Sequence, residues 1–186
     1  MAHKMGRFFF RGSEQVKADA SGRFVIPQEM RFGLIENGKL EFALALGFGG
    51  SLAIYPMSEM EKLVESFRGK EHLARYQSFF TLFFSTLHTA TCDEKGRVQI
   101  PALLRKAIGL PEDAGSELVV AGVMNRVEIW PAAAYAARAS EFLKGSGAME
   151  SLFEEAAAGK SGGTAVSDSV HALFERANSD GISARG

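Results

Sequence analysis

Cysteine is nearly absent from this sequence of 186 residues, since Cys92 is the only one. A disulfide within the chain needs two cysteines, so none can form, and a reducing cytoplasm is the expected setting. Long apolar runs are missing too, because none approaches the roughly 20 residues that a membrane span needs. The start, Met1 to Arg7, has no apolar segment of the signal-peptide kind. We therefore expect a cytoplasmic protein without a membrane segment.

Positive charge is also scarce. The chain has 21 lysines and arginines against 22 aspartates and glutamates, which gives a formal net charge of −1. Proteins that bind nucleic acid usually carry a basic balance. The bases are unevenly placed, and several crowd the first part of the chain at Lys4, Arg7, Arg11, Lys17, Arg23 and Arg31. A basic surface for a nucleic acid would therefore have to be assembled from several subunits.

Motifs for catalysis and for binding metals or other cofactors are missing. The histidines lie at positions 3, 72, 88 and 171, without ligand spacing. The glycine-rich stretch 47–51 lacks the Gly-Lys-Ser/Thr ending of a phosphate-binding loop. No Gly-x-Ser-x-Gly or other nucleophile motif is present. We expect neither an enzyme nor a protein that requires a cofactor.

The sequence does contain a duplicated module. Asp19-Ala20-Ser21-Gly22-Arg23, followed by Phe24-Val25-Ile26-Pro27, is matched 74 residues later by Asp93-Glu94-Lys95-Gly96-Arg97, followed by Val98-Gln99-Ile100-Pro101. Further pairs match at an offset of 74 or 75, namely Phe10 and Phe84, Arg31 and Arg105, Gly47 and Gly122, Ile54 and Ile129, Tyr55 and Trp130, and Pro56 and Pro131. Such self-similarity indicates one structural unit used twice. Because a module of about 70 residues is near the lower limit for an independent core, we expect the two to share one.

Each module predicts the same order of elements: a strand, a tight turn, a return strand, a short helix begun by proline, two strands and a final helix. In the first module the predicted strands are 14–18, 24–26, 40–46 and 51–55, and the helices are 27–33 and 58–67. In the second module the strands are 86–92, 98–100, 117–121 and 126–130, and the helices are 101–108 and 132–144.

Further predictions concern the start of one helix and three segments outside this common order. Ser58-Glu59-Met60-Glu61 has the form of a capping box, which predicts that Ser58 and Glu61 satisfy the free N–H groups at the start of the helix that ends at Phe67. The phenylalanine-rich segment 71–84 predicts another helix, buried between the halves or between subunits. Residues 1–6 are expected to be a loose leader, and residues 145–186 a flexible tail with weak helices at 149–158 and 169–178.

The repeated turn carries the candidate site. An aspartate at the head of a tight turn can accept hydrogen bonds from backbone N–H groups two residues on, and glycine supplies a backbone conformation that residues with a Cβ atom resist. The residues predicted to structure the turns are therefore Asp19, Gly22, Asp93 and Gly96.

The arginine after each turn glycine, Arg23 or Arg97, is expected to project from the hairpin end. Its rigid fork of donors can hold a phosphate, or guanine in the major groove of DNA. The alternative is a purely structural role, in which each arginine only forms an ion pair with an aspartate. Our interpretation combines the two, with the aspartate positioning an arginine that meets DNA.

Other polar residues near the turns are secondary candidates. Lys17, Ser21 and Lys95 are candidate phosphate contacts, or else ordinary solvated surface. Arg31 and Arg105 recur on the short helices, where they either contact DNA or make ion pairs inside the fold.

Paired Asp-x-x-x-Arg elements, each leading into a short apolar strand and a proline-started helix, together with Phe10-Arg11-Gly12, resemble the MraZ family over roughly residues 8–144. The resemblance implies an α+β fold of two tandem SpoVT/AbrB-like swapped-hairpin modules, at 8–68 and 86–144. A connecting helix at 69–85 would join them, and together they would form one pseudo-twofold unit with flanking helices.

The same resemblance implies a function. It points to a sequence-specific DNA-binding transcriptional regulator that associates with the nucleoid and assembles into a homo-oligomeric ring. Its partner would be double-stranded promoter DNA with direct repeats, in front of its own division and cell-wall gene cluster, and its usual effect would be repression.

Two other functions remain open at this point. An AbrB-like antitoxin would use residues 145–186 to neutralise a toxin, although such antitoxins usually have one module per chain. A ring-forming scaffold that binds protein and no DNA would suit the near-neutral charge.

Overall fold

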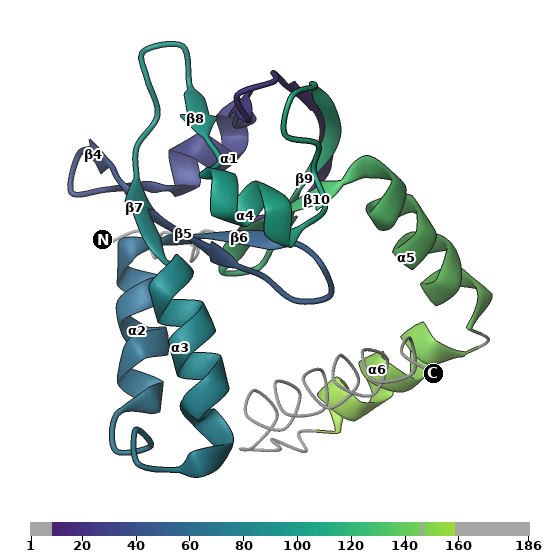
Figure 1. Ribbon diagram of the computed structural model, residues 1–186. Helices are drawn as coiled ribbons and strands as arrows, with labels where there is room; N and C mark the ends of the chain where they lie inside the picture. Colours follow the sequence, from purple (N-terminus) through teal and green to yellow (C-terminus); the bar gives the residue numbers. More distant parts are fainter. Residues whose placement is uncertain (1–8, 146, 159–186) are drawn as a thin grey trace, which may run out of the picture. The chain divides into compact units, whose positions relative to one another are not determined.

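The computed structural model describes residues 9–145 and 147–158, and the chain divides into two compact units, with the first reaching Tyr135 and the second beginning at Ala136. The leader at 1–6 and the helix predicted at 169–178 lie outside the described residues. The first unit is a mixed α+β body with an antiparallel sheet and helices (Figure 1). Among the described residues, no helix has the length and apolar character needed to cross a membrane.

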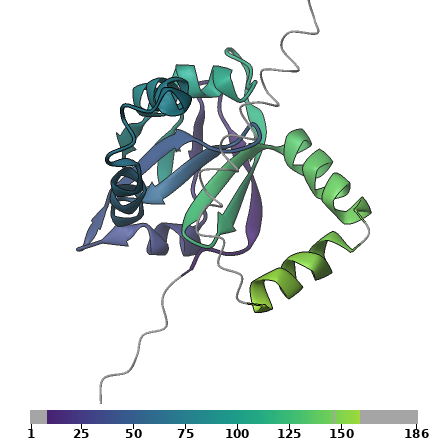
Figure 2. The ribbon, with the colours of Figure 1, turned by 90° about the horizontal axis from the view of Figure 1, so that it is seen from below.

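A six-stranded antiparallel sheet forms the centre of the first unit (Figure 2). Its strands in spatial order are β1 (Ser13–Ala18), β9 (Ser116–Val123), β10 (Arg126–Pro131), β6 (Leu52–Pro56), β5 (Phe42–Leu46) and β7 (His88–Ala90). The two edges of the sheet are built in the same way. At one edge β1 of the first repeat pairs with β9 of the second, and at the other β7 of the second repeat pairs with β5 of the first. Each repeat therefore supplies an edge strand to the other.

A separate two-stranded β-ribbon also takes one strand from each repeat. It consists of β2 (Arg23–Val25) and β8 (Arg97–Gln99), in which Phe24 faces Val98 and both side chains are buried. Ile26 and Ile100 follow the two strands and are fully buried. Their N–H groups donate to the carbonyl of the turn glycine in the opposite repeat, at 3.1 and 3.0 Å. The strand after each turn thus pairs with the other repeat, although its first residue, Arg23 or Arg97, still accepts a hydrogen bond from the aspartate N–H of its own turn.

One hydrophobic core unites the two repeats, as predicted. The short helices α1 (Gln28–Gly33) and α4 (Ala102–Ala107) bury Met30 and Leu104 in it. The sheet contributes residues from both repeats, including Leu44, Ile54, Leu118, Val120 and Ile129. Burying one large apolar side chain contributes about 1.5–3 kcal/mol. Because each repeat holds only part of this core, neither is expected to be stable alone.

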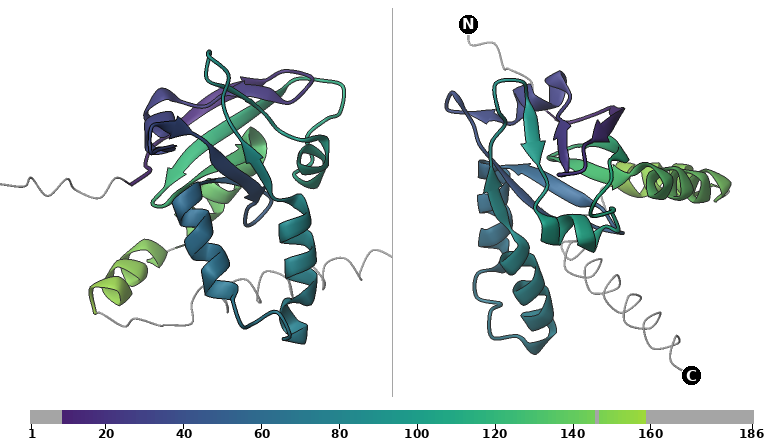
Figure 3. Two further views of the ribbon diagram at one scale, coloured as in Figure 1. Left: turned by 90° about the vertical axis from the view of Figure 1, so that its left-hand side faces the viewer. Right: turned by 45° about the horizontal axis from the view of Figure 1, so that its top comes forward.

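A helical pair packs on β5 and β6 and extends away from the β-ribbon (Figure 3). It consists of α2 (Met57–Phe67) and α3 (Gln77–Thr86), preceded by a 3-10 turn, η1 (Ala74–Tyr76). Phe67 contacts Tyr76 and Phe79 through ring centroids 6.2 and 5.2 Å apart, which ties the ends of the pair together. Within one chain α3 lies against β5 and buries Phe83 and Thr86, so it is not buried between the halves; burial of its other face between subunits stays a prediction.

Two details of the first repeat differ from the sequence prediction. Phe10 is buried and bridges Met124, whereas Phe84 lies on α3, so this matched pair does not occupy equivalent positions. A small hairpin, β3 (Ile35–Glu36) and β4 (Lys39–Leu40), was not predicted. Its turn, Asn37-Gly38, has φ of +52° and +75° at the two residues. The Asn-Gly pair is the usual signal for such a turn.

The predicted capping box is wrong. The helix α2 begins at Met57, directly after Pro56, so Ser58 lies inside the first turn and cannot be the N-cap. Instead the Glu36 carboxylate of β3 accepts hydrogen bonds from both the backbone N–H of Ser58, at 2.9 Å, and its hydroxyl. The new hairpin therefore supplies the acceptor that the sequence pattern assigned to Glu61.

The second unit contains most of helix α5 (Ala132–Lys144) and the whole of helix α6 (Ala148–Ala157). Helix α5 agrees with the helix predicted over the same residues, and α6 agrees with the weak helix predicted at 149–158. The side chains of Met149, Leu152 and Phe153 on α6 are exposed.

Replacing Glu36 with Ala should lower the free energy of unfolding by about 1 kcal/mol, because the first turn of α2 loses its acceptor. Chemical denaturation of the full chain measures this loss. The matched control is Glu61→Ala, which should change stability by less than about 0.5 kcal/mol, as expected for an exposed position. Equal losses in the two variants would contradict the assignment of Glu36 as the cap.

Candidate nucleic-acid interface

The carboxylate of Asp19 organises the first of the repeated turns, Asp19–Arg23, which we call turn 1. Its Oδ1 accepts hydrogen bonds from the N–H of Ser21 and the N–H of Arg23, both at 2.9 Å, and from the Ser21 hydroxyl at 2.6 Å. The backbone closes the turn, since the Gly22 N–H donates to the Asp19 carbonyl at 2.9 Å. Gly22 has φ of +78°, a conformation that favours glycine.

Turn 2, Asp93–Arg97, repeats this arrangement in the second repeat. Asp93 Oδ1 accepts from the N–H groups of Lys95 and Arg97, both at 2.9 Å. The Gly96 N–H donates to the Asp93 carbonyl at 2.8 Å, and Gly96 has φ of +74°. The two Asp-x-x-x-Arg segments therefore form the same local structure.

These hydrogen bonds favour the charged form of each carboxylate and lower its pKa. For Asp19 the largest cause of the lowered pKa is the Ser21 hydroxyl, followed by the backbone N–H of Arg23. For Asp93 the backbone N–H of Arg97 is the largest cause, followed by the Arg97 side chain. Both aspartates are therefore ionised at neutral pH.

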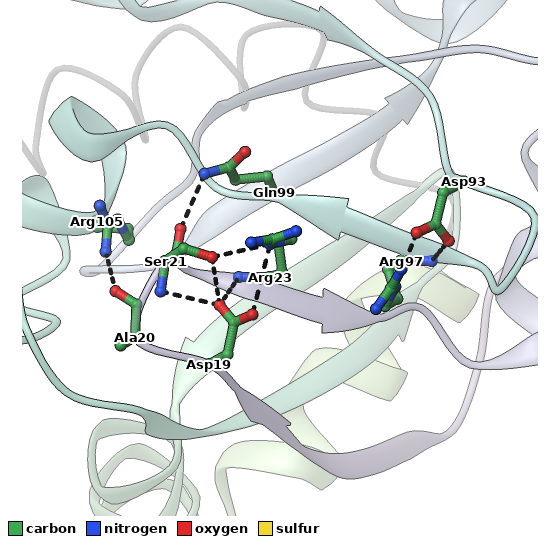
Figure 4. A network of polar contacts seen from close by, with 8 residues as sticks. All are labelled: Asp19, Ala20, Ser21, Arg23, Asp93, Arg97, Gln99 and Arg105. Carbon is green, nitrogen blue, oxygen red and sulfur yellow. Dashed lines mark hydrogen bonds and ion pairs between the residues drawn. The ribbon is translucent and has the colours of Figure 1, made fainter.

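The two turns hold their arginines differently (Figure 4). In turn 1 the Nε of Arg23 donates to the Ser21 hydroxyl at 2.9 Å and lies 3.5 Å from Asp19 Oδ2. In turn 2 the Nε of Arg97 donates directly to Asp93 Oδ2 at 2.7 Å. Both contacts use Nε, on the inner side of the guanidinium, which leaves its two terminal amino groups further out. The side chains are 51% and 43% exposed.

Arg23 and Arg97 lie on one face of the β-ribbon. Arg23 is paired with Gln99, and Val25 is paired with Arg97. Because residues directly opposite each other in an antiparallel pair point to the same face, these four side chains share the exposed face, while Phe24 and Val98 point into the core. Diagonal neighbours of this kind have Cα atoms about 7–8 Å apart. Both arginine side chains therefore lie on the same exposed face of the β-ribbon.

Sequence reasoning missed Val25 and Gln99 as members of this face. A sequence signal was available for Gln99, since Arg97-Val98-Gln99-Ile100 alternates polar and apolar residues as half-buried strands do, but not for Val25, which stands in the apolar run Phe24-Val25-Ile26. What the sequence did not reveal was the cross-repeat register that places the two alternations side by side.

The secondary candidates lie in different settings. The hydroxyl of Ser21 links Asp19 to Arg23 inside turn 1. Lys17 lies on β1, where its Nζ is 3.3 Å from Glu117 Oε1 and its side chain is 82% exposed. Lys95 is exposed in turn 2.

Arg31 and Arg105 each lie against the turn of the opposite repeat. Arg105 Nη1 donates to the Ala20 carbonyl at 2.9 Å and to the Glu112 carbonyl at 3.4 Å. The guanidinium of Arg31 occupies the space beside Gly96, where a Cβ atom would collide with it. Neither forms an ion pair within the described part of the chain. For Arg105, backbone carbonyls therefore take the place of the carboxylate that an internal ion pair would need.

The fold and the site define a two-repeat α+β protein whose Asp-x-x-x-Arg turns present paired arginines on a ribbon shared by both repeats. The chain belongs to the MraZ family: the family model described as "MraZ protein, putative antitoxin-like" matches residues 9–78 and 83–155. Among curated relatives, the transcriptional regulator MraZ of Symbiobacterium thermophilum is 36% identical over 133 residues, which cover 70% of this chain and 89% of the relative. The transcriptional regulator MraZ of Solidesulfovibrio magneticus is 34% identical over 125 residues, covering 65% and 78%.

Replacing Ser21 with Ala should raise the pKa of Asp19 towards the ordinary value and leave the pKa of Asp93 unchanged, because turn 2 has no hydroxyl at this position. A group with a lowered pKa stabilises the fold above its unfolded pKa, and this contribution is lost as the pH falls through the folded value. Turn 1 of the variant should therefore loosen at a higher pH than turn 2. NMR titration of labelled aspartate carboxyls measures both pKa values, and equal shifts in the two aspartates would refute this role of Ser21.

Proposed function

We propose that this protein is a sequence-specific, double-stranded DNA-binding transcriptional regulator and that the exposed face of the β-ribbon reads the DNA. The observation that carries the proposal is the placement of Arg23 and Arg97, one from each repeat, on the same exposed face. The names of the curated relatives, which are transcriptional regulators, support the same conclusion.

The chemistry of this face suits the major groove. A two-stranded β-ribbon fits the groove, and an arginine fork can bind O6 and N7 of guanine through two hydrogen bonds. The amide of Gln99 suits adenine, and the apolar side chain of Val25 suits the methyl group of thymine. Lys17, Ser21 and Lys95 are the proposed phosphate contacts, which would set the position of the protein along the duplex. For Ser21 this contact would require its hydroxyl to turn away from Asp19.

Several chains must act together for useful affinity. One chain presents two reading arginines and has a net charge of −1, so a single chain would bind weakly. We propose that the two swapped-hairpin modules form one pseudo-twofold unit and that such units assemble into a homo-oligomeric ring. Contacts linked around a ring raise the effective concentration of each next contact, and direct repeats in the DNA would match successive subunits.

The proposed target is repeated boxes in the promoter of the protein's own division and cell-wall gene cluster, with repression as the effect. The protein would then act in the cytoplasm, in association with the nucleoid. This part of the proposal is supported by family membership alone.

An AbrB-like antitoxin is the second candidate. The matched family is described as antitoxin-like, and α6 exposes Met149, Leu152 and Phe153 on a single helix. A toxin that co-purifies with the full chain and dissociates when these three residues are replaced with Ser would favour this function. Binding to upstream DNA without such a partner would favour the regulator.

Replacing Arg23 or Arg97 with Ala should weaken binding to a duplex from the DNA upstream of the protein's own gene by about 1–3 kcal/mol each, since each variant loses one base-reading fork. Replacing both should abolish detectable binding and leave oligomer size unchanged. Gel-shift titration and size-exclusion chromatography measure the two properties.

The matched control for this experiment is Arg68→Ala, which removes the same charge at the end of α2, on the helical pair that extends away from the β-ribbon. Its affinity should stay within about twofold of the native chain. Unchanged binding by the double Arg variant would reject the assigned reading surface.

Salt should weaken the binding steeply. Each neutralised phosphate contributes a slope of about −0.9 to the plot of log K against log salt concentration, because counterions are released. Replacing Lys17 or Lys95 with Ala should make this slope less steep by about 0.9 each, the contribution of one phosphate contact. Each replacement should lower the affinity by a similar factor for all DNA sequences. A flat salt dependence for the native chain would argue against DNA as the ligand.

A further inference from the structure

We propose that Arg105, in the second repeat, is a positioning residue for Arg23, in the first: it holds the turn from which Arg23 reads DNA. This inference rests on the proposed function and adds a residue that acts without touching the DNA. It also means that the two reading arginines depend on the opposite repeat to different degrees.

Three successive carbonyls of turn 1 accept hydrogen bonds from the second repeat. Arg105 Nη1 donates to the Ala20 carbonyl at 2.9 Å. Gln99 Nε2 donates to the Ser21 carbonyl at 3.1 Å, and the Ile100 N–H donates to the Gly22 carbonyl at 3.0 Å. The backbone just before Arg23 is therefore fixed from outside its own repeat.

The side chain of Arg105 is itself held in place. It comes from α4, whose Leu104 is fully buried in the shared core. Its stem packs so closely under Gly22 that a Cβ atom at that glycine would lie 2.5 Å from Arg105 Cδ. The Nε atom is buried, and Nη1 faces two backbone carbonyls. This geometry holds Nη1 against the backbone of turn 1, which suits positioning rather than DNA contact.

Turn 2 is held in another way. The residue equivalent to Gln99 is Val25, which has no amide to donate, and the residue equivalent to Arg105 is Arg31, which lies beside Gly96. The Ile26 N–H supplies the backbone bond, at 3.1 Å. Arg97 is instead bound directly by Asp93 of its own turn, at 2.7 Å. Both arginines keep contacts within their own turns, but the backbone of turn 1 accepts three hydrogen bonds from the opposite repeat, whereas that of turn 2 accepts one.

The test is a pair of double-mutant cycles on the full chain, with the upstream duplex as probe. Arg105→Met keeps the stem under Gly22 and removes the donors, so it should weaken binding about three- to tenfold, as expected for the loss of one hydrogen bond. It should have no further effect in the Arg23→Ala background and its full effect in the Arg97→Ala background. Arg105→Lys, which keeps one donor, should restore part of the affinity.

A second readout does not require DNA. In Arg105→Met the amide protons of Ser21 and Gly22 should exchange faster with solvent, while those of Lys95 and Gly96 should stay as in the native chain. The matched control is Arg31→Met, which should leave the amides of turn 1 unchanged.

The outcomes separate the two ideas. If Arg105→Met adds its full effect to Arg23→Ala, Arg105 contacts DNA directly and the positioning role is wrong. If it couples equally to Arg23 and Arg97, or exposes the amides of both turns, it acts by general destabilisation and the role is also wrong. If neither Arg23→Ala nor Arg97→Ala affects binding, the proposed function fails, and the amide exchange alone decides whether Arg105 holds turn 1.

Discussion

The structure depends on the carboxylate at the head of each repeated turn, which accepts hydrogen bonds from backbone N–H groups two and four residues further on. This contact shapes the tight turn, and glycine completes it with a positive φ. It also fixes the backbone of the following arginine, so that the guanidinium starts from a defined point. Because the turn leads directly into β2 or β8, the same carboxylate sets where the β-ribbon begins.

The second constraint is that neither repeat completes the site alone. The β-ribbon needs one strand from each repeat, its buried face joins a core common to both, and the turn glycines accept hydrogen bonds from the opposite repeat. Two small modules thereby form one shared surface with two arginines on the same side. The duplication therefore arranges the site as well as stabilising the fold. A single module would present one arginine on an unpaired strand.

Much of this arrangement was predictable from local patterns. The turns, the short helices after Pro27 and Pro101 and the shared core follow from residues close in sequence. Two of the failures share one cause, which is that partners distant in sequence replaced local ones. Glu36, rather than Glu61, accepts the hydrogen bond from the Ser58 N–H at the start of α2. Arg105 donates to a backbone carbonyl rather than to a carboxylate. The membership of Val25 and Gln99 in the site depends on a register between repeats, which alternation within one strand cannot specify.

The most direct test of the central claim is a structure of the full chain bound to a duplex from the DNA upstream of its own gene. The account predicts that Arg23 and Arg97 of one chain enter the same stretch of major groove, each within hydrogen-bonding distance of base edges, while Asp19 and Asp93 keep their bonds to the turn backbone. A duplex held elsewhere, for example along α2 and α3 or by only one of the two arginines, would contradict it.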